Sequence, residues 1–263
     1  MNEDAFTLTL TTAELLCAAT ALGIAALQLP PEANSQPTGA ALQAEIRQGY
    51  GSLQQRGLVE AVSPVQWQVD NLLTILVHWL AAPDSVLKLD AWQSTGERRQ
   101  AFLFFWQAQA LWLQSETNTH HFTLFKAADS WLKHSTDWIG HLVEAVDEPV
   151  LPIPPVNLSA FLPMVQQNVT VMELMMQRAG LAPEMARQTL ANLAVVERAV
   201  TLTWQDGSRQ ISRQAILLCA PIGTWGGEVG GKDELVLLRP FSSPDLLHLL
   251  SADVIHFASH FKE

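Results

Sequence analysis

Residues 86–93 read Val-Leu-Lys-Leu-Asp-Ala-Trp-Gln, and residues 200–205 read Val-Thr-Leu-Thr-Trp-Gln. Both stretches are rich in the β-branched, aliphatic and aromatic residues that favour strands. They also resemble each other in sequence. This resemblance predicts that the chain contains two copies of one structural unit.

Further matches between the two parts follow at a nearly constant spacing. Arg99-Gln100-Ala101 matches Arg213-Gln214-Ala215 at an offset of 114 residues. Trp112 matches Trp225 at an offset of 113, and the segment 123–126 matches 236–239 at that same offset. Any one of these matches alone would be expected by chance, so the steady offset carries the argument.

The sequence predicts an α+β protein of two similar halves, each made of helices, an antiparallel meander and a final helix. Four prolines fall within residues 149–155 and predict a stiff connector. We therefore place the halves at residues 1–146 and 157–263, with a connector at 147–156. Two copies are too few for a solenoid, so a pseudo-twofold arrangement with helices outside the sheets is the expected architecture.

Helix boundaries are marked by short-range signals. Thr11 and Glu14 form a capping-box pattern ahead of an apolar run. A second helix is expected over residues 40–56, ended by Gly57. The sequence Ser63-Pro64-Val65-Gln66 predicts the start of a third helix, and residues 158–178 predict a long one.

Composition excludes several classes of protein. The chain has 263 residues, of which 48% are hydrophobic and 16% charged, so global disorder is excluded. A formal charge of -11 argues against nucleic acid and anionic membranes as partners. The two cysteines cannot form a disulfide framework, and the acidic N-terminus lacks the basic start of a secretory signal. We expect a cytoplasmic protein.

No sequence pattern predicts a catalytic, metal or cofactor site. The glycines of residues 226–231 and Lys232 resemble a phosphate-binding loop, but Asp233 stands where Ser or Thr is needed. We interpret this stretch as a flexible hairpin tip. His256 and His260 share a helix face, yet two ligands do not make a zinc site. His120-His121 is expected in a polar turn, with the histidines solvent-facing or amphipathic. We expect no metal and no cofactor.

Methionines gather in one segment. Five of the six fall within residues 164–185. Flexible thioethers suit a surface that accepts varied apolar partners, but a gap-filled helix core is the favoured interpretation of the pattern, and a binding groove is the alternative.

Three segments resemble the EspG family, the cytosolic chaperones of type VII (ESX) secretion. They are Leu10–Leu16, the Leu53–Val59 turn with its L-x-x-R-G-L pattern, and the helix ending at Pro83 with the strand 86–89 behind it. The resemblance implies a pseudo-twofold fold with a central sheet flanked by helical bundles. It also implies binding of helical secretion substrates of the PE/PPE type.

We expect a non-enzymatic protein that buries the apolar tip of a helical client against one sheet and the adjacent methionine-bearing helix. The residues predicted to bind this partner are Met172, Met175, Met176, Trp225, Leu235 and Leu237. Two alternatives stay open: a small-molecule enzyme or sensor that uses a groove between the halves, and a dimeric scaffold protein. The sequence does not decide the oligomeric state, and a homodimer is among the options.

Overall fold

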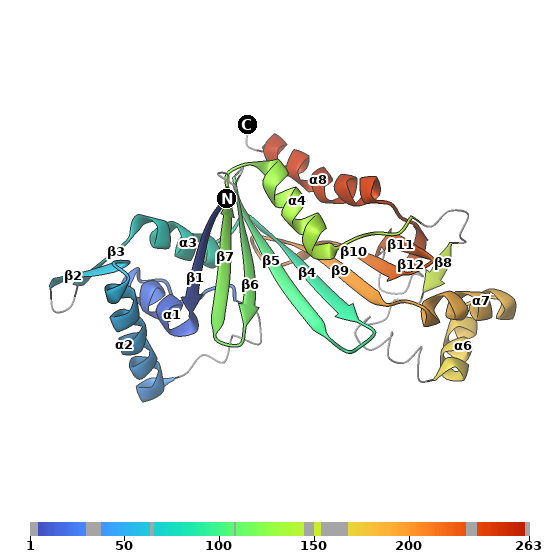
Figure 1. Ribbon diagram of the computed structural model, residues 1–263, viewed down its shortest axis with the longest axis horizontal. Coiled ribbons are helices and arrows are strands. Elements are labelled where there is room, and N and C mark those ends of the chain that lie inside the picture. Colours follow the sequence, from blue (N-terminus) through green and yellow to red (C-terminus); the bar gives the residue numbers. More distant parts are fainter. Residues whose placement is uncertain are drawn as a thin grey trace. The chain divides into compact units, whose positions relative to one another are not determined.

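The computed structural model describes residues 5–29, 38–63, 66–107, 109–144, 150–153, 168–229 and 236–260, the side chains of Gln66 and 253–260 excepted. Figure 1 shows the described helices and strands. The chain forms two compact units. Unit 1 comprises Met1–Val86, Ala101–Trp131 and Asp206–Arg209; unit 2 comprises Leu87–Gln100, Leu132–Gln205 and Gln210–Glu263.

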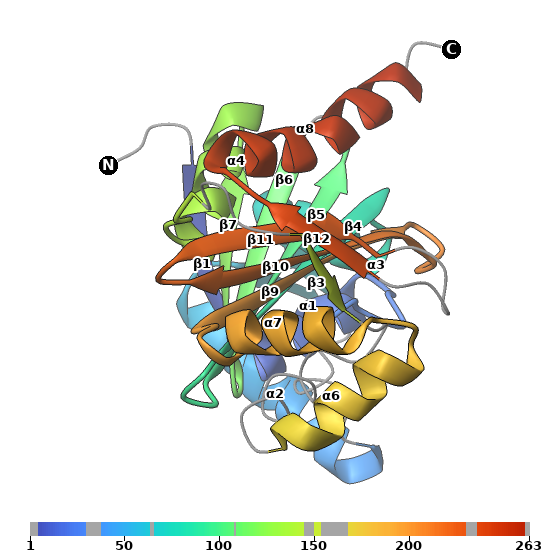
Figure 2. The same ribbon diagram turned by 90° about the vertical axis from the view of Figure 1, so that its right-hand side faces the viewer.

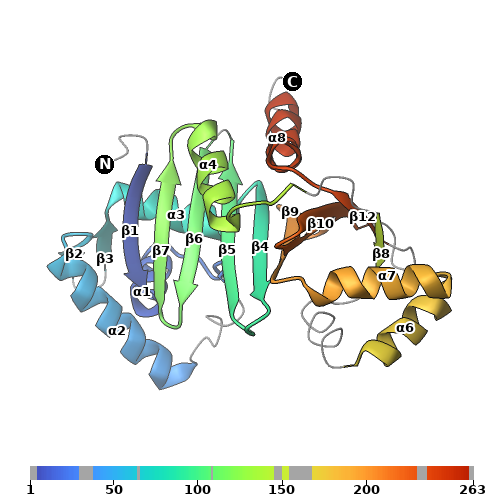
Figure 3. The same ribbon diagram turned by 45° about the vertical axis from the view of Figure 1, so that its right-hand side comes forward.

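Unit 1 consists of a sheet and a three-helix bundle. Its helices are α1 (Thr12–Ala21), α2 (Gly39–Gln55) and α3 (Asn71–Ala81). Its strands are β1 (Ala5–Thr11), β2 (Val59–Ser63), β3 (Gln66–Val69), most of β5 (Arg98–Trp106), β6 (Gln109–Glu116) and β7 (Thr119–Phe125). The sheet has the order β1-β7-β6-β5, and its registered pairs are antiparallel (Figure 3). Strands β2 and β3 form a separate hairpin.

Two of the predicted helix signals are confirmed in unit 1. Thr11 is the N-cap of α1, and both hydrogen bonds of the capping box with Glu14 are present. Helix α2 ends at Gln55, and Gly57 follows with a φ of 69°, a left-handed conformation that glycine adopts without a steric penalty.

The predicted start of the third helix is wrong. Ser63 and Gln66 lie in the β2–β3 hairpin, and α3 begins only at Asn71, after the N-cap Asp70. The carboxylate of Asp70 accepts hydrogen bonds from the backbone N–H groups of Leu72 and Leu73. Asp70, not Ser63, is therefore the residue that caps α3. A tertiary contact favours the hairpin over a helix here: the ring of Trp67 in β3 packs against the ring of Tyr50 in α2, with 4.6 Å between the ring centroids.

Helices α1 and α2 cross at very close range. Gly49 of α2 lies against Ala13 of α1, and a Cβ on Gly49 would sit 2.1 Å from the carbonyl oxygen of Ala13. Behind this crossing lies the core of unit 1, in which Leu15, Leu53 and Trp79 are fully or almost fully buried.

Unit 2 combines a longer sheet with three helices. Its strands are most of β4 (Ser85–Gln93), β8 (Leu151–Ile153), β9 (Arg198–Asp206), β10 (Ile211–Ala220), β11 (Gly223–Glu228) and β12 (Val236–Pro240). Its helices are α6 (Val169–Arg178), α7 (Pro183–Ala194) and α8 (Ser243–His260). The sheet has the order β4-β9-β10-β11-β12-β8. Helix α4 (Ala128–Ile139) begins in unit 1 and ends in unit 2.

The sheet of unit 2 has a different covering on each face. Helices α6 and α7 lie on one side of strands β9 to β12, and α8 lies on the other (Figure 2). The first face contributes Ile216, Leu218 and Val236 to a core shared with α6 and α7. Residues that alternate with these point to the α8 side, because successive side chains of a strand face opposite ways.

The α+β class is confirmed, with antiparallel strand pairs and seven helices in the described part of the chain. Strands β4 to β7 and β9 to β12 are each followed by a helix, α4 and α8. The internal duplication itself stays a prediction. The two compact units divide the chain differently from the predicted segments 1–146 and 157–263, since Leu87–Gln100 belongs to unit 2.

Candidate partner-binding groove

Three of the six residues predicted to bind a partner are core residues. Met172, Met176 and Trp225 have no exposed surface. They meet in the core of unit 2, where α6 packs on the sheet. The prediction is wrong for these three. Met172 and Met176 are four residues apart on α6 and place one helix face against the sheet. Trp225 lies on β11, on the sheet face that α6 covers.

The other three residues have different positions. Met175 is partly buried and packs against the same core. Leu235 lies outside the described residues. Leu237 is 51% exposed and points away from that core, because its neighbours Val236 and Leu238 belong to it. Among the five members of the predicted set that the structure describes, Leu237 is therefore the one exposed apolar side chain.

Leu237 lines an open groove on the α8 side of the unit 2 sheet. The lining comes from β10 to β12, the segment after β12 and the first turns of α8: Arg213, Gly226, Gly227, Glu228, Leu237, Arg239, Pro240, Phe241, Asp245, His248 and Leu249. The empty space amounts to about 1350 Å³, open solvent included. Its lining mixes apolar side chains, among them Leu237, Phe241 and Leu249, with charged ones, among them Arg213, Glu228 and Asp245. Protein-binding surfaces commonly combine both kinds of side chain.

Two glycines shape the floor of the groove. A Cβ on Gly226 would lie 2.4 Å from the ring of Phe241, and one on Gly227 would lie 2.6 Å from the carbonyl oxygen of Leu237. Both glycines are in strand β11, so the interpretation of this part as a flexible hairpin tip is wrong. Residues 230–235, which include Lys232 and Asp233, lie outside the described residues.

The charged groups at the rim are held in place by neighbours within unit 2. The guanidinium of Arg213 donates to the carboxylate of Glu228 and stacks 4.9 Å above the ring of Trp204. The carboxylate of Asp245 accepts from the backbone and hydroxyl of Ser242, which caps α8. The groove therefore presents fixed charges beside its apolar side chains, and the described residues that line it place no nucleophile next to a base.

A second polar cluster in unit 2 escaped the sequence analysis. Asp90 on β4 is 6% exposed and forms ion pairs with Lys88 at 2.8 Å and Arg98 at 3.1 Å. Gln100 also donates a hydrogen bond to Asp90, and Arg98 lies 5.4 Å from the ring of Trp92. The signal was present in the sequence, because Lys88, Asp90 and Trp92 alternate along one strand face. Each acidic oxygen here has a basic or amide partner, which is typical of a structural ion-pair cluster.

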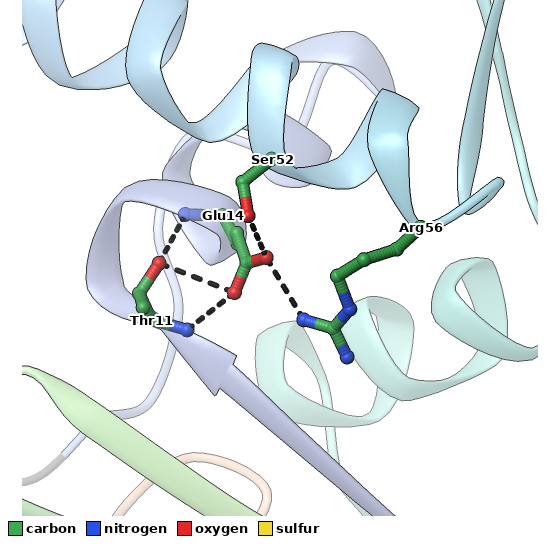
Figure 4. A network of polar contacts seen from close by, with 4 residues as sticks. All are labelled: Thr11, Glu14, Ser52 and Arg56. Atoms are coloured by element: carbon green, nitrogen blue, oxygen red, sulfur yellow. Dashed lines mark hydrogen bonds and ion pairs between the residues drawn. The ribbon is translucent and has the colours of Figure 1, made fainter.

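Two of the segments that resemble EspG proteins meet in unit 1 (Figure 4). Glu14 of the opening helix accepts hydrogen bonds from the hydroxyl of Ser52 at 2.7 Å and from Arg56 at 2.8 Å. Its second oxygen accepts from the backbone of Thr11 at 2.7 Å. Burial raises the pKa of Glu14, but these hydrogen bonds and the charge of Arg56 outweigh it and hold the pKa below its usual value. The capping box and the Arg56-Gly57 turn thus form one structural contact.

His120 is buried, contrary to the expectation of a solvent-facing turn. It has no exposed surface and lies on β7, between the hydroxyls of Thr12 and Ser115 at 3.0 and 2.8 Å. Burial, with a contribution from the charge of His121, lowers its pKa to about 4. The ring is therefore neutral at physiological pH and bridges α1 to the β6–β7 hairpin.

Metal binding finds no support in the described residues, which hold no group of three His, Cys, Asp or Glu side chains near enough to share an ion. The side chains of His256 and His260 are not among them. Cys17 and Cys219 are buried, free thiols, and burial raises the pKa of Cys17 to about 11. No described helix is long and apolar enough to span a bilayer.

Comparison with known proteins gives a structural match only. No protein-family model matches the chain, and no curated protein matches it in sequence. A match occurs in the solved structure of the Mycobacterium tuberculosis type VII secretion system chaperone EspG5 in complex with the PE25-PPE41 dimer. The TM-score is 0.61 at 12% sequence identity, and the alignment covers 96% of this chain and 96% of that chain. The fold is EspG-like. At 12% identity the similarity concerns the fold alone, and the function has to be argued from the surface of this chain.

Proposed function

We propose that this chain is a non-enzymatic, cytosolic secretion chaperone or adaptor that binds a helical client of the PE/PPE type. The observation that carries the proposal is the EspG-like fold along 96% of the chain. The pseudo-twofold duplication predicted from the sequence belongs to the same proposal. The equivalent element order of β4–α4 and β9–α8 supports it.

We place the client on the groove of β11, β12 and α8. Its apolar side chains, with Leu237 and the ring of Phe241, can contact the apolar tip of a helical protein, and its charged side chains can contact polar groups beside that tip. Leu237 is 51% exposed, so its side chain is available for contact. Gly226 and Gly227 have no side chain, so the ring of Phe241 and the backbone of Leu237 can pack closely against β11. An open groove favours a protein partner over a small molecule, because small-molecule sites are enclosed.

The test compares two exposed apolar residues of unit 2. Leu237 is 51% exposed in the groove, and Met185 is 52% exposed on α7, away from the residues that line it. The tagged chain and its Leu237→Glu and Met185→Glu variants are each purified from native cells, followed by size exclusion and mass spectrometry. We expect the parent and Met185→Glu to bring down a helical secretion substrate in stoichiometric amount, and Leu237→Glu to lose at least about 90% of it, since a charge on an apolar contact is strongly unfavourable.

Two outcomes would contradict the proposal. A parent chain that purifies without any helical substrate argues against the chaperone function. If both variants recover as much helical substrate as the parent chain, the chaperone function stands but the groove is not the binding site. Met175 is not a suitable probe, because it packs partly buried against the core and Met175→Glu would lower stability.

A further inference from the structure

Strand β1 is the outermost strand of the unit 1 sheet. It pairs with β7 through seven consecutive residues, from Ala5 opposite Phe125 to Thr11 opposite Thr119, without a bulge (Figure 3). Within the described residues no strand pairs with its other side. The outer edge of β1 is a regular template for one more strand.

This edge lacks the features by which proteins prevent edge-to-edge pairing. Residues 5–11 read Ala-Phe-Thr-Leu-Thr-Leu-Thr, with no charge, proline or glycine. The edge strand of the unit 2 sheet is the opposite case: β8 has three residues, and Pro152 stands at its centre opposite Leu237. Its short length and its proline make the β8 edge a poor template for another strand, whereas β1 has neither feature.

Exposed apolar side chains adjoin the open edge. Phe6 on β1 is 43% exposed, and Ile75 on α3 is 42% exposed. Both line a small cavity under the sheet whose walls are wholly apolar: Phe6, Leu8, Leu72, Ile75, Leu76, Trp79, Leu111, Phe122 and Leu124. A partner that adds a strand to β1 would cover this apolar rim as well.

The sequence of β1 is complementary to itself. In an antiparallel pair centred on Leu8, Phe6 lies opposite Leu10 and Thr7 lies opposite Thr9. The apolar residues then stay on one sheet face and the threonines on the other, and threonine pairs across strands are favourable. Because the same patch serves both molecules, the contact closes as a twofold dimer.

We propose that β1 is a dimerisation strand, which pairs antiparallel with β1 of a second copy of this chain about Leu8. The second copy is favoured over an unrelated strand by this self-complementarity and by the absence of charge that would select another partner. The proposal is independent of the client-binding function.

The first test is the molar mass by sedimentation equilibrium at concentrations up to about 100 μM. We expect a dimer for the parent chain. Thr7→Arg places like charges across the twofold axis, as natural edges do, and should raise the dimer dissociation constant more than about tenfold. Ile211→Arg is the control, since Ile211 is an exposed strand residue, 62% exposed, in unit 2 and should leave the dimer unchanged. Equal thermal unfolding of the variants shows that Thr7→Arg folds.

The second test fixes the register with cysteines. The native Cys17 and Cys219 are buried and should not react. Under mild oxidation the Thr7→Cys/Thr9→Cys double variant should form a covalent dimer, because Thr7 faces Thr9 of the partner subunit. Thr7→Cys alone should not, since it would not face itself. A monomeric parent chain, a dimer that survives Thr7→Arg, or efficient cross-linking of Thr7→Cys alone would each overturn the proposal, as would cross-linking to a different protein.

Discussion

The contact of Glu14 with Ser52 and Arg56 gives the sharpest prediction about stability. Glu14 is 2% exposed, and its carboxylate accepts hydrogen bonds from Thr11, Ser52 and Arg56 at 2.7 to 2.8 Å. Glu14→Ala removes these acceptors and leaves the Thr11 amide and the Ser52 hydroxyl without them. A polar group left unpaired costs about 1–3 kcal/mol when it is buried, and the lower end applies here because Thr11 is exposed and Ser52 is half-buried.

The contribution of Arg56 is smaller than a buried ion pair would suggest, because its side chain is 36% exposed and water screens the charge. We therefore expect Glu14→Ala to lower the free energy of unfolding by about 3 kcal/mol. Glu14→Gln keeps the shape and one acceptor and should cost about half as much. A double-mutant cycle of Glu14→Gln with Arg56→Met should give a coupling of about 1 kcal/mol.

The assay is urea unfolding at pH 7 followed by circular dichroism. Glu60→Ala is the control, since Glu60 is an exposed carboxylate of unit 1. The pH dependence gives an independent check: with a folded-state pKa below 4.5, the stabilisation by Glu14 is fully present above that value and is lost as the pH falls through the folded pKa. If Glu14→Ala costs less than about 1 kcal/mol, or no more than Glu60→Ala, the network does not hold α1 to α2.

Three further predictions concern buried or closely packed positions. His120 has a folded pKa of about 4 against 6.5 in the unfolded chain, so the unfolded state binds more protons between these values and stability falls, by up to about 3 kcal/mol, as the pH drops through that window. His120→Gln should flatten the unfolding free energy between pH 6.5 and 4.5, and an unchanged slope would show that the ring is accessible to protons. Gly49→Ala should destabilise by at least about 2 kcal/mol in thermal or urea unfolding, because the backbone of Ala13 cannot move aside, whereas Gly51→Ala in the same helix has open space and should be neutral or stabilising. Gly226→Ala should displace the ring of Phe241 and weaken client recovery more than it lowers stability, and full recovery would mean that the floor of the groove is not used.

Short-range signals in the sequence were sufficient for a large part of the fold. The alternating residues of 86–93 and 200–205 form β4 and β9. The capping box at Thr11 and the glycine at position 57 mark the helix ends, because both depend on hydrogen bonds and backbone angles within a few residues. The same locality allowed the α+β class to be predicted from composition and periodicity alone.

The candidate site was only partly predictable. Leu237 belonged to the set predicted to bind a partner, and the structure places it in the groove. Met172 and Trp225 belonged to the same set but lie in the core on the other face of the sheet. Whether a methionine on an amphipathic helix faces a partner or a sheet depends on which other segment packs against it. That information lies in the long-range contact of α6 with β11, which no local pattern contains.

Strand β1 and His120 show most directly what the tertiary structure alone decided. The apolar residues Phe6, Leu8 and Leu10 alternate, but seven residues are a strand only because β7, more than a hundred positions later, supplies the hydrogen bonds. His120 is buried because the same pairing brings it under the start of α1. The sequence by itself determined the class, the two strand motifs and the caps, since their causes are local. The edge of the sheet, the buried histidine and the groove depend on contacts between distant segments, and only the folded chain brings those together.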